Sequence, residues 1–162
     1  SFTVSLVWRP LLPEAQIRTS ILAASLVAQK QHAQQNYLGS GIVRRSLNSQ
    51  VLQAAKSTPY ALGAYAVMLP AALGHADDTY AGQSESGGNE TGRFSVYWSR
   101  SEKGELTLEN LTEDDINDTK PDVNNIPANE WFACSIRVHA PCLLNPYKDT
   151  SNNKEMMMVT VT

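Results

Sequence analysis

The residues best suited to bind a small molecule stand in the stretch TGRFSVYWSR, residues 91–100. Its alternation and its aromatic and β-branched content are typical of a strand. Successive side chains of a strand point to opposite faces, which sorts this stretch into two sets: Phe94, Val96, Trp98 and Arg100 on one face, and Ser95, Tyr97 and Ser99 on the other. We expect one face to meet helices and the other to meet whatever covers the sheet. For each aromatic residue taken alone, a structural role is the simpler interpretation: Phe94 and Trp98 in the core, and Tyr97 as a cross-strand partner.

Catalytic and metal chemistry find little support in the sequence. The histidines are dispersed, at His32, His75 and His139, and neither GxSxG nor HExxH occurs. The loop GGNETG lacks the Lys-Ser or Lys-Thr ending of a phosphate-binding loop. His75 could touch a metal together with Asp77 and Asp78, but ordinary solvation of a flexible loop is the simpler interpretation. We therefore expect no enzyme, no catalytic residue, no metal and no cofactor.

Only two cysteines are present, Cys134 and Cys142, eight positions apart. They are too few for a disulfide scaffold and lack the CxxC spacing of a zinc site. They could form a bridge in an oxidising compartment, but two free buried thiols are the commoner arrangement. Free thiols are therefore the expectation.

Size and charge exclude several classes of protein. The 162 residues are 42% hydrophobic and 18% charged, which suits one folded domain of neutral polar surface. A formal charge of −3 with scattered basic residues makes nucleic acid an unlikely partner. No apolar run approaches the roughly 18 residues of a membrane span, and SFTVSLVWRP lacks the basic start and cleavage site of a signal peptide.

The first part of the chain is predicted to be helical. Apolar residues in 13–38 recur at spacings of three, four and seven, which predicts an amphipathic helix of about seven turns. Gly39 and Gly41 interrupt it, and a second helix is expected from about 42 to 56, ending before Pro59. A helical region, residues 1–58, would thus precede the rest of the domain.

The remainder, residues 59–162, predicts a sheet and its cover. Strands are expected at ALGAYAVML, closed by Pro70, at RFSVYWSR with ELTLENL as a hairpin, and at LLNPYKD and EMMMVTVT around an SNN turn. Residues 74–92 suit a long surface loop that gates or lines a site. Asp114 and Asp115 after Thr112 suit the start of a short helix, and EWFACSIRVHA is helix-like. This order favours one α+β domain with an antiparallel sheet of about five strands.

Several stretches, taken in order, resemble the extracytoplasmic Cache domains, which are PAS-like sensor modules of bacterial methyl-accepting chemotaxis proteins and other transmembrane receptors. Trp131 and Phe132, then Pro146, Tyr147 and Asp149, then MMMVTVT look like that family's aromatic pair on a pocket helix, its PY-x-D strand and the strand after it. One chemoreceptor branch also shows TGRF-x-x-YW-x-R, similar to residues 91–100. Its preceding strand and loop are similar to 62–70 and 74–92. The resemblance covers about residues 60–162, and the long N-terminal helix fits by position.

The resemblance implies a ligand pocket between the sheet and its cover, with Trp131 and Tyr147 as walls and Asp149 as a polar anchor. Aromatic walls supply apolar area, and a few fixed polar groups set the orientation of a ligand. Asp149 could receive an ammonium group, or it could cap the SNN turn. The candidate ligand-binding residues are Tyr97, Trp98, Arg100, Trp131, Phe132, Tyr147 and Asp149.

Two departures from the family pattern bear on the ligand. Amino-acid-sensing members carry Tyr, Arg five residues on and Trp two beyond, where this chain has Asn124, Asn129 and Trp131. Asparagine cannot grip a carboxylate as arginine does, so a plain α-amino acid is not expected. Leu69 and Ala71 also stand where the branch with TGRF commonly has Glu and Asn, which favours a less polar ligand or none.

The sequence therefore predicts a sensor domain of a bacterial chemoreceptor that binds a small molecule in the periplasm. The resemblance further implies a homodimer with the N-terminal helices side by side, and a membrane connection through other parts of the parent protein. The alternative is a spacer or protein-interaction module whose pocket is filled by its own side chains, among them Met68, Leu69 and Trp98.

Overall fold

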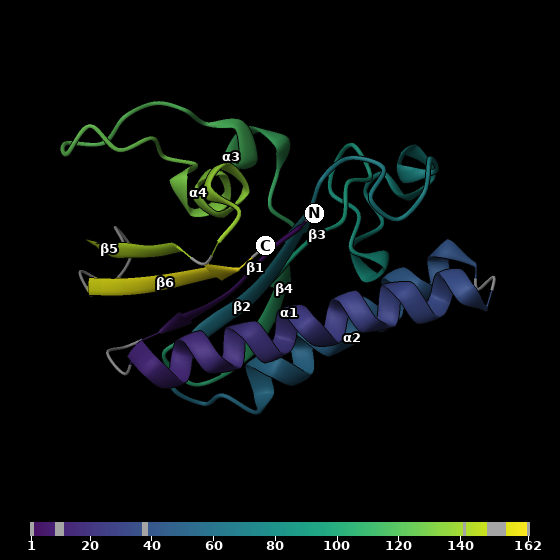
Figure 1. Cartoon of the computed structure of the whole chain (residues 1–162), viewed down its shortest axis with the longest axis horizontal. Coiled ribbons are helices and arrows are strands. Elements are labelled where there is room, and N and C mark those ends of the chain that lie inside the picture. The colour runs from purple at the N-terminus through teal and green to yellow at the C-terminus, as the bar shows by residue number, and fades with distance from the viewer. Residues whose placement is uncertain (1, 9–11, 37–38, 141, 149–154, 162) are drawn as a thin grey trace.

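The computed structural model describes residues 2–8, 12–36, 39–140, 142–148 and 155–161, and these form an α+β structure around one antiparallel sheet (Figure 1). The strands lie in the order β4-β3-β2-β1-β6-β5, and every neighbouring pair is antiparallel. Their bounds are β1 (Phe2–Trp8), β2 (Ala61–Met68), β3 (Ser95–Arg100), β4 (Leu106–Glu109), β5 (Cys142–Lys148) and β6 (Glu155–Val161). The α+β class and the antiparallel pairing are confirmed.

The expectation of about five strands with helices first is wrong, because a strand precedes the helices. β1 lies between β2 and β6 in the middle of the sheet, with Ser5 opposite both Tyr65 and Thr160. The alternation of Phe2, Val4 and Leu6 is a strand signal within the region predicted to be helical, residues 1–58. The sheet has six strands as a result.

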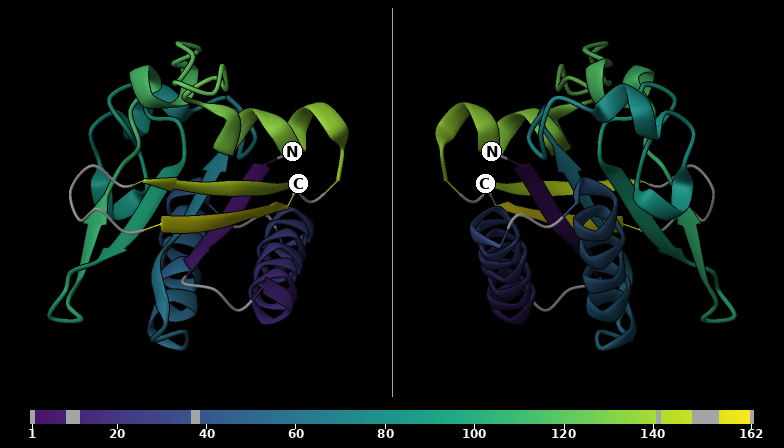
Figure 2. Two further views of the ribbon diagram at one scale, coloured as in Figure 1. Left: turned by 90° about the vertical axis from the view of Figure 1, so that its left-hand side faces the viewer. Right: turned by 90° about the vertical axis from the view of Figure 1, so that its right-hand side faces the viewer.

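Two long helices cover one face of the sheet (Figures 1 and 2). α1 (Leu12–Gln35) packs on β1 and β6, and α2 (Ser40–Lys56) packs on β2 and β3. α1 ends before the predicted limit at residue 38; residues 37–38 lie outside the described residues. Neither helix, nor any other in the described part of the chain, is long and apolar enough to cross a membrane.

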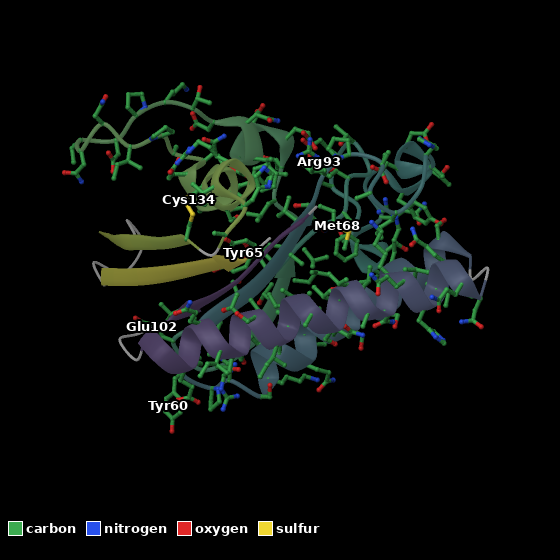
Figure 3. The ribbon with its side chains drawn as sticks, viewed as in Figure 1. Tyr60, Tyr65, Met68, Arg93, Glu102 and Cys134 are labelled. Atoms are coloured by element: carbon green, nitrogen blue, oxygen red, sulfur yellow. A yellow bond between two sulfur atoms is a disulfide. The ribbon has the colours of Figure 1, made fainter. Side chains whose placement is uncertain are left out.

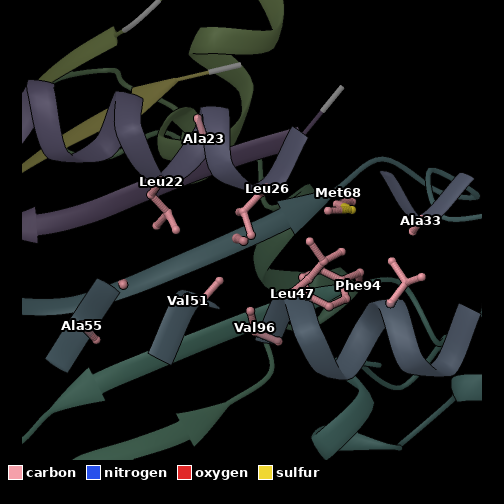
Figure 4. Packing of buried hydrophobic residues seen from close by; sticks show 13 residues of the cluster. Leu22, Ala23, Leu26, Ala33, Leu47, Val51, Ala55, Met68, Phe94 and Val96 are labelled. Atoms are coloured by element: carbon pink, nitrogen blue, oxygen red, sulfur yellow. The ribbon is translucent and has the colours of Figure 1, made fainter. Parts of the chain in front are cut away.

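The main hydrophobic core lies between these helices and the sheet (Figure 4). Leu26 and Leu47 are fully buried and pack with Phe94 and Val96, which were predicted to share one face of their strand. The small side chains of Ala64 and Ala66 on β2 let the helices approach the sheet closely. Complete burial of one such leucine side chain stabilises the fold by about 1.5–3 kcal/mol.

The opposite face carries shorter helices, α3 (Glu113–Asn117) and α4 (Glu130–Val138). α3 starts at a capping box, in which Thr112 and Asp115 each bind the other's backbone N–H; this confirms the predicted helix start. α4 contacts β1, β5 and β6, so it lies over the same central strands that α1 supports from the other side. The connector between α3 and α4 extends away from the sheet (Figure 1).

The long loop between β2 and β3 joins the two sides at one end of the sheet. Arg44 of α2 is fully buried, forms a salt bridge with Asp77, and lies over the ring of Tyr80 at 4.3 Å from its centroid. A Cβ atom on Gly88 would lie 1.9 Å from the Tyr80 carbonyl oxygen, so this close approach requires glycine. The loop is therefore compact and fixed to the helical layer.

Candidate ligand-binding site

Aromatic side chains gather on the face of the sheet opposite the long helices. Tyr65 on β2 pairs in register with Tyr97 on β3, and their rings meet edge to face with centroids 6.4 Å apart. A Cβ atom on Gly63 would lie 2.6 Å from the Tyr97 ring, so the bare backbone of Gly63 makes room for that ring. The predicted alternation of this strand is confirmed, since Tyr97 and Val96 belong to different hydrophobic clusters.

α4 brings the second half of the cluster. The Trp131 ring stands edge to face on Tyr65 at 5.3 Å between centroids, and it lies 5.8 Å from the Phe132 ring. The Tyr65 hydroxyl donates a hydrogen bond to the backbone oxygen of Trp131 at 3.2 Å, which ties the helix to the sheet. Tyr65 and Phe132 are buried, whereas Tyr97 and Trp131 are only half-buried. The half-buried pair is therefore the accessible part of the cluster.

Asn129, at the position of the missing arginine, has a structural role. Its amide Nδ2 donates to the backbone oxygen of Ile116 at 3.0 Å, and its backbone N–H donates to the oxygen of Asp118 at 2.8 Å. These bonds fix the start of α4 against α3, on which the buried Ile116 packs into the aromatic cluster. Asn124 lies in an exposed turn held by Asp122. Nothing in the residue types at these two positions announces such roles.

The structure places two of the candidate residues on the other face of the sheet. Trp98 packs against the main core, and its Nε1 donates to Oδ1 of Asn48 on α2 at 2.9 Å. Arg100 donates to the backbone oxygens of Ala55 at 2.5 Å and Ala61 at 3.0 Å, at the end of α2 and the start of β2. These two side chains join α2 to the sheet and lie apart from the aromatic cluster.

Tyr147 belongs to β5, the edge strand farthest from β3 and β4, where its backbone pairs with Met156 of β6. Asp149 lies outside the described residues. The structure thus brings Tyr97, Trp131 and Phe132 together around Tyr65, a residue that sequence analysis had not selected. The parity of Tyr65 in the strand ALGAYAVM, opposite to that of Ala64 and Ala66, could have identified it.

Arg93 of the TGRF stretch fixes the loop to the helical cover. Its Nε lies 2.9 Å from Oε1 of Glu113 at the start of α3. The same Glu113 oxygen accepts hydrogen bonds from Oγ1 of Thr91 and from Nδ2 of the buried Asn89. This network positions α3 and, through Ile116, one side of the aromatic cluster. The loop 74–92 supports the cover of the site.

The expectation of two free thiols is wrong. Cys134 on α4 and Cys142 at the start of β5 form a disulfide, with their Cα atoms 6.2 Å apart (Figure 3). His139 ends α4 in the left-handed conformation, with φ of 52°, so the chain reverses direction between the two cysteines. The disulfide therefore links the helix that carries Trp131 to the edge strand of the sheet.

The acidic residues considered as metal ligands form other interactions. Asp77 binds Arg44 through Oδ1 and accepts the Ala71 backbone N–H through Oδ2 at 2.7 Å. Asp78 accepts the N–H of Thr79. Among the described residues, no three His, Cys, Asp or Glu side chains gather as metal ligands would.

Two surface hollows lie along the long helices. One, of about 750 Å³, runs between α1 and α2 and is lined by residues such as Ile17, Ile21 and Gln50. The other, of about 410 Å³, lies between Lys30, Ser40 and Gly74. Neither includes Tyr97 or Trp131.

Comparison with known proteins relates the chain to a receptor. No protein-family model matches it. The chain is 32% identical over 132 residues to the methyl-accepting chemotaxis protein TlpQ of Pseudomonas aeruginosa, a match that covers 82% of this chain and 18% of that protein. The chain is thus homologous to a segment of a chemotaxis receptor, and spans about a fifth of that receptor's length.

Proposed function

We propose that this chain is the sensor domain of a transmembrane chemoreceptor, with a PAS-like fold of the Cache type, and that it binds a small molecule outside the cytoplasm. The observation that carries the proposal is the aromatic cluster, in which half-buried Tyr97 and Trp131 stand on either side of buried Tyr65. Homology to a segment of a chemotaxis receptor supports the receptor context. Binding, rather than turnover, is the proposed activity.

The disulfide supports an extracytoplasmic location. Disulfides form and persist in the periplasm and other oxidising compartments and are rare in the cytosol. The Cys134–Cys142 bond therefore suits a domain that folds outside the cytoplasm. The membrane connection would come from other parts of the receptor.

The arrangement of layers suggests how binding would become a signal. α4 and α1 lie on opposite faces of the same two strands, β1 and β6. A ligand that contacts Trp131 would favour one position of α4 on these strands, and the strands would bias the position of α1. Such a signal requires that the ligand bind one of the two arrangements more tightly.

The role of Asn129 supports a ligand other than a plain α-amino acid. Its side chain is engaged with the backbone of Ile116, so it does not substitute for a carboxylate-binding arginine. Trp131 and Tyr97 offer ring faces and edges, which suit an apolar or aromatic group. Asp149 and Tyr147 are proposed to complete the site.

The exposed surface of α1 supports a homodimer with these helices side by side. Ile17 and Ile21, one turn apart, are 60% and 62% exposed, and both line the hollow between α1 and α2. Burying these two isoleucine side chains between paired helices would contribute about 2–4 kcal/mol toward association.

Thermal-shift screening with a broad metabolite panel tests the ligand-binding proposal. A ligand at 100 times its Kd stabilises the folded state by about 2.7 kcal/mol, which raises the Tm by about 5–10 °C for a domain of this size. Trp131→Ala should abolish the shift. Trp98→Phe is the matched control on the other face and should retain it, although it loses the bond to Asn48. If no compound raises the Tm, the spacer function is favoured. If a ligand raises the Tm of both variants equally, the binding site is not on the aromatic face.

A further inference from the structure

The two ends of α4 are attached to the rest of the molecule in different ways. The first turn is held by several noncovalent contacts: Asn129 bonds to Ile116 and Asp118, the Tyr65 hydroxyl bonds to the Trp131 oxygen, and Phe132 is buried in the aromatic cluster. Loss of any one of these contacts leaves the others. The first turn is therefore secured independently of the disulfide.

In the second half of α4, Ser135 is fully buried, but the last residues of the helix have fewer such contacts. Arg137, Val138 and His139 are exposed, and Arg137 pairs with Glu130 of the same helix, which gives no attachment to the sheet. Ile136 contributes a half-buried contact to the cluster. The Cys134–Cys142 bond joins this half covalently to β5. A nine-residue helix is too short to persist without tertiary contacts, so this bond holds the last turns in place together with the buried Ser135 and the half-buried Ile136.

The two cysteine residues differ in exposure. Cys142 is 7% exposed, whereas Cys134 is half-buried. Thiol–disulfide exchange needs in-line access of a thiolate to one sulfur. Because Cys134 is the more exposed residue, we infer that an incoming thiol attacks its sulfur.

We propose that the Cys134–Cys142 disulfide is a redox-sensitive lock on the last turns of α4, so that reduction loosens the C-terminal half of the helix that carries Trp131 and weakens ligand binding at the aromatic site. A dithiol reductant would open the lock. Its thiolate attacks Sγ of Cys134, the sulfur–sulfur bond breaks, and Sγ of Cys142 leaves as a thiolate that takes up a proton. The second thiol of the reductant then displaces Cys134, also as a thiol, and the reductant becomes a disulfide. The consequence for ligand affinity rests on the proposed function; the structural lock does not.

Hydrogen exchange measured by mass spectrometry tests the lock without any ligand. The chain has only two cysteines, so dithiothreitol changes this one bond. We expect reduction to raise the exchange rate of amides in 134–138 at least tenfold relative to those of 43–55 in α2. The Cys134→Ser/Cys142→Ser variant should match the reduced protein and should not respond to dithiothreitol. Equal acceleration of both segments, or of neither, would overturn the proposal.

A second measurement separates the lock from the proposed function. Any compound that shifts the Tm in the metabolite screen is titrated into the oxidised and reduced chain by calorimetry, and its Kd should rise at least tenfold on reduction. An unchanged Kd would show that the lock does not control the site, even if exchange in α4 increases. A screen without hits leaves the exchange result to decide the structural lock by itself.

Discussion

The two faces of the sheet use the same strands for different purposes. Toward α1 and α2, β2 presents Ala64 and Ala66, and β3 presents Val96, all fully buried. Toward α3 and α4, the same two strands present the alternate residues Tyr65 and Tyr97, which are large aromatic side chains with polar ends. One face is closely packed and buried, while the other leaves Tyr97 and Trp131 partly accessible.

Under the proposed function, this difference separates the residues that stabilise the fold from those that bind a ligand. Each atom removed from a closely packed interior lowers the free energy of unfolding, because neighbouring groups cannot collapse into the space. Truncating a half-buried aromatic side chain lowers the free energy of unfolding by less. Such a side chain also keeps exposed surface that a ligand could contact. The alternation of a strand allows both to be encoded within the six residues of β3.

The largest effect is expected from Phe94→Ala on the helix face. Phe94 is 1% exposed, so we expect the free energy of unfolding to fall by about 3–5 kcal/mol, measured by urea denaturation. Leu106→Ala, at the half-buried edge of the same core, is the matched control and should lose about 1 kcal/mol. If Trp131→Ala lowers the free energy of unfolding as much as Phe94→Ala does, the two faces do not differ in their contribution to stability.

Asp77→Ala should be the next most destabilising change, because it leaves the charge of Arg44 buried without its partner. Burial lowers the pKa of Arg44, and Asp77 opposes that shift. Removing one member of a buried pair costs about 3–5 kcal/mol, whereas replacing both members is often neutral. We therefore expect Asp77→Ala to lose about 3 kcal/mol in urea denaturation.

The double variant Arg44→Met/Asp77→Ala should recover most of that loss. It removes the buried charge together with its partner, and methionine keeps much of the volume. A double variant as unstable as Asp77→Ala would show that Asp77 acts mainly by accepting the Ala71 N–H.

Sequence periodicity predicted the elements whose evidence is local. The helices and the two faces of RFSVYWSR followed from spacings within a few residues. The alternation that places Phe94 toward the helices also places Trp98 and Arg100 there. The resemblance to the family selected these two residues for the site, although the alternation puts them on the face opposite Tyr97. Met68 and Trp98, suggested as pocket-filling residues, pack in the helix-face core, while Leu69 does pack against the aromatic cluster.

Features that depend on distant partners were not predictable in the same way. β1 pairs with residues about 60 and 155 positions away, and the disulfide depends on a left-handed turn at His139. The use of Asn129 depends on the carbonyl of Ile116, thirteen residues earlier. Such contacts are set by tertiary structure, and an eight-residue spacing of cysteines gives no measure of their distance in space.

The smallest effect tests whether the aromatic face has local stability of its own. Thr112→Ala removes the hydroxyl that accepts the Asp115 N–H at 3.1 Å, and loss of such a cap costs about 1 kcal/mol. Thr112→Ser keeps the hydroxyl and should lose only a few tenths of a kcal/mol. Because α3 holds Ile116 in the aromatic cluster, exchange should accelerate in 113–117 and in the first turn of α4, while amides of α2 change little. If α2 accelerates equally, the two faces unfold as one unit, and their division of labour lies only in accessibility.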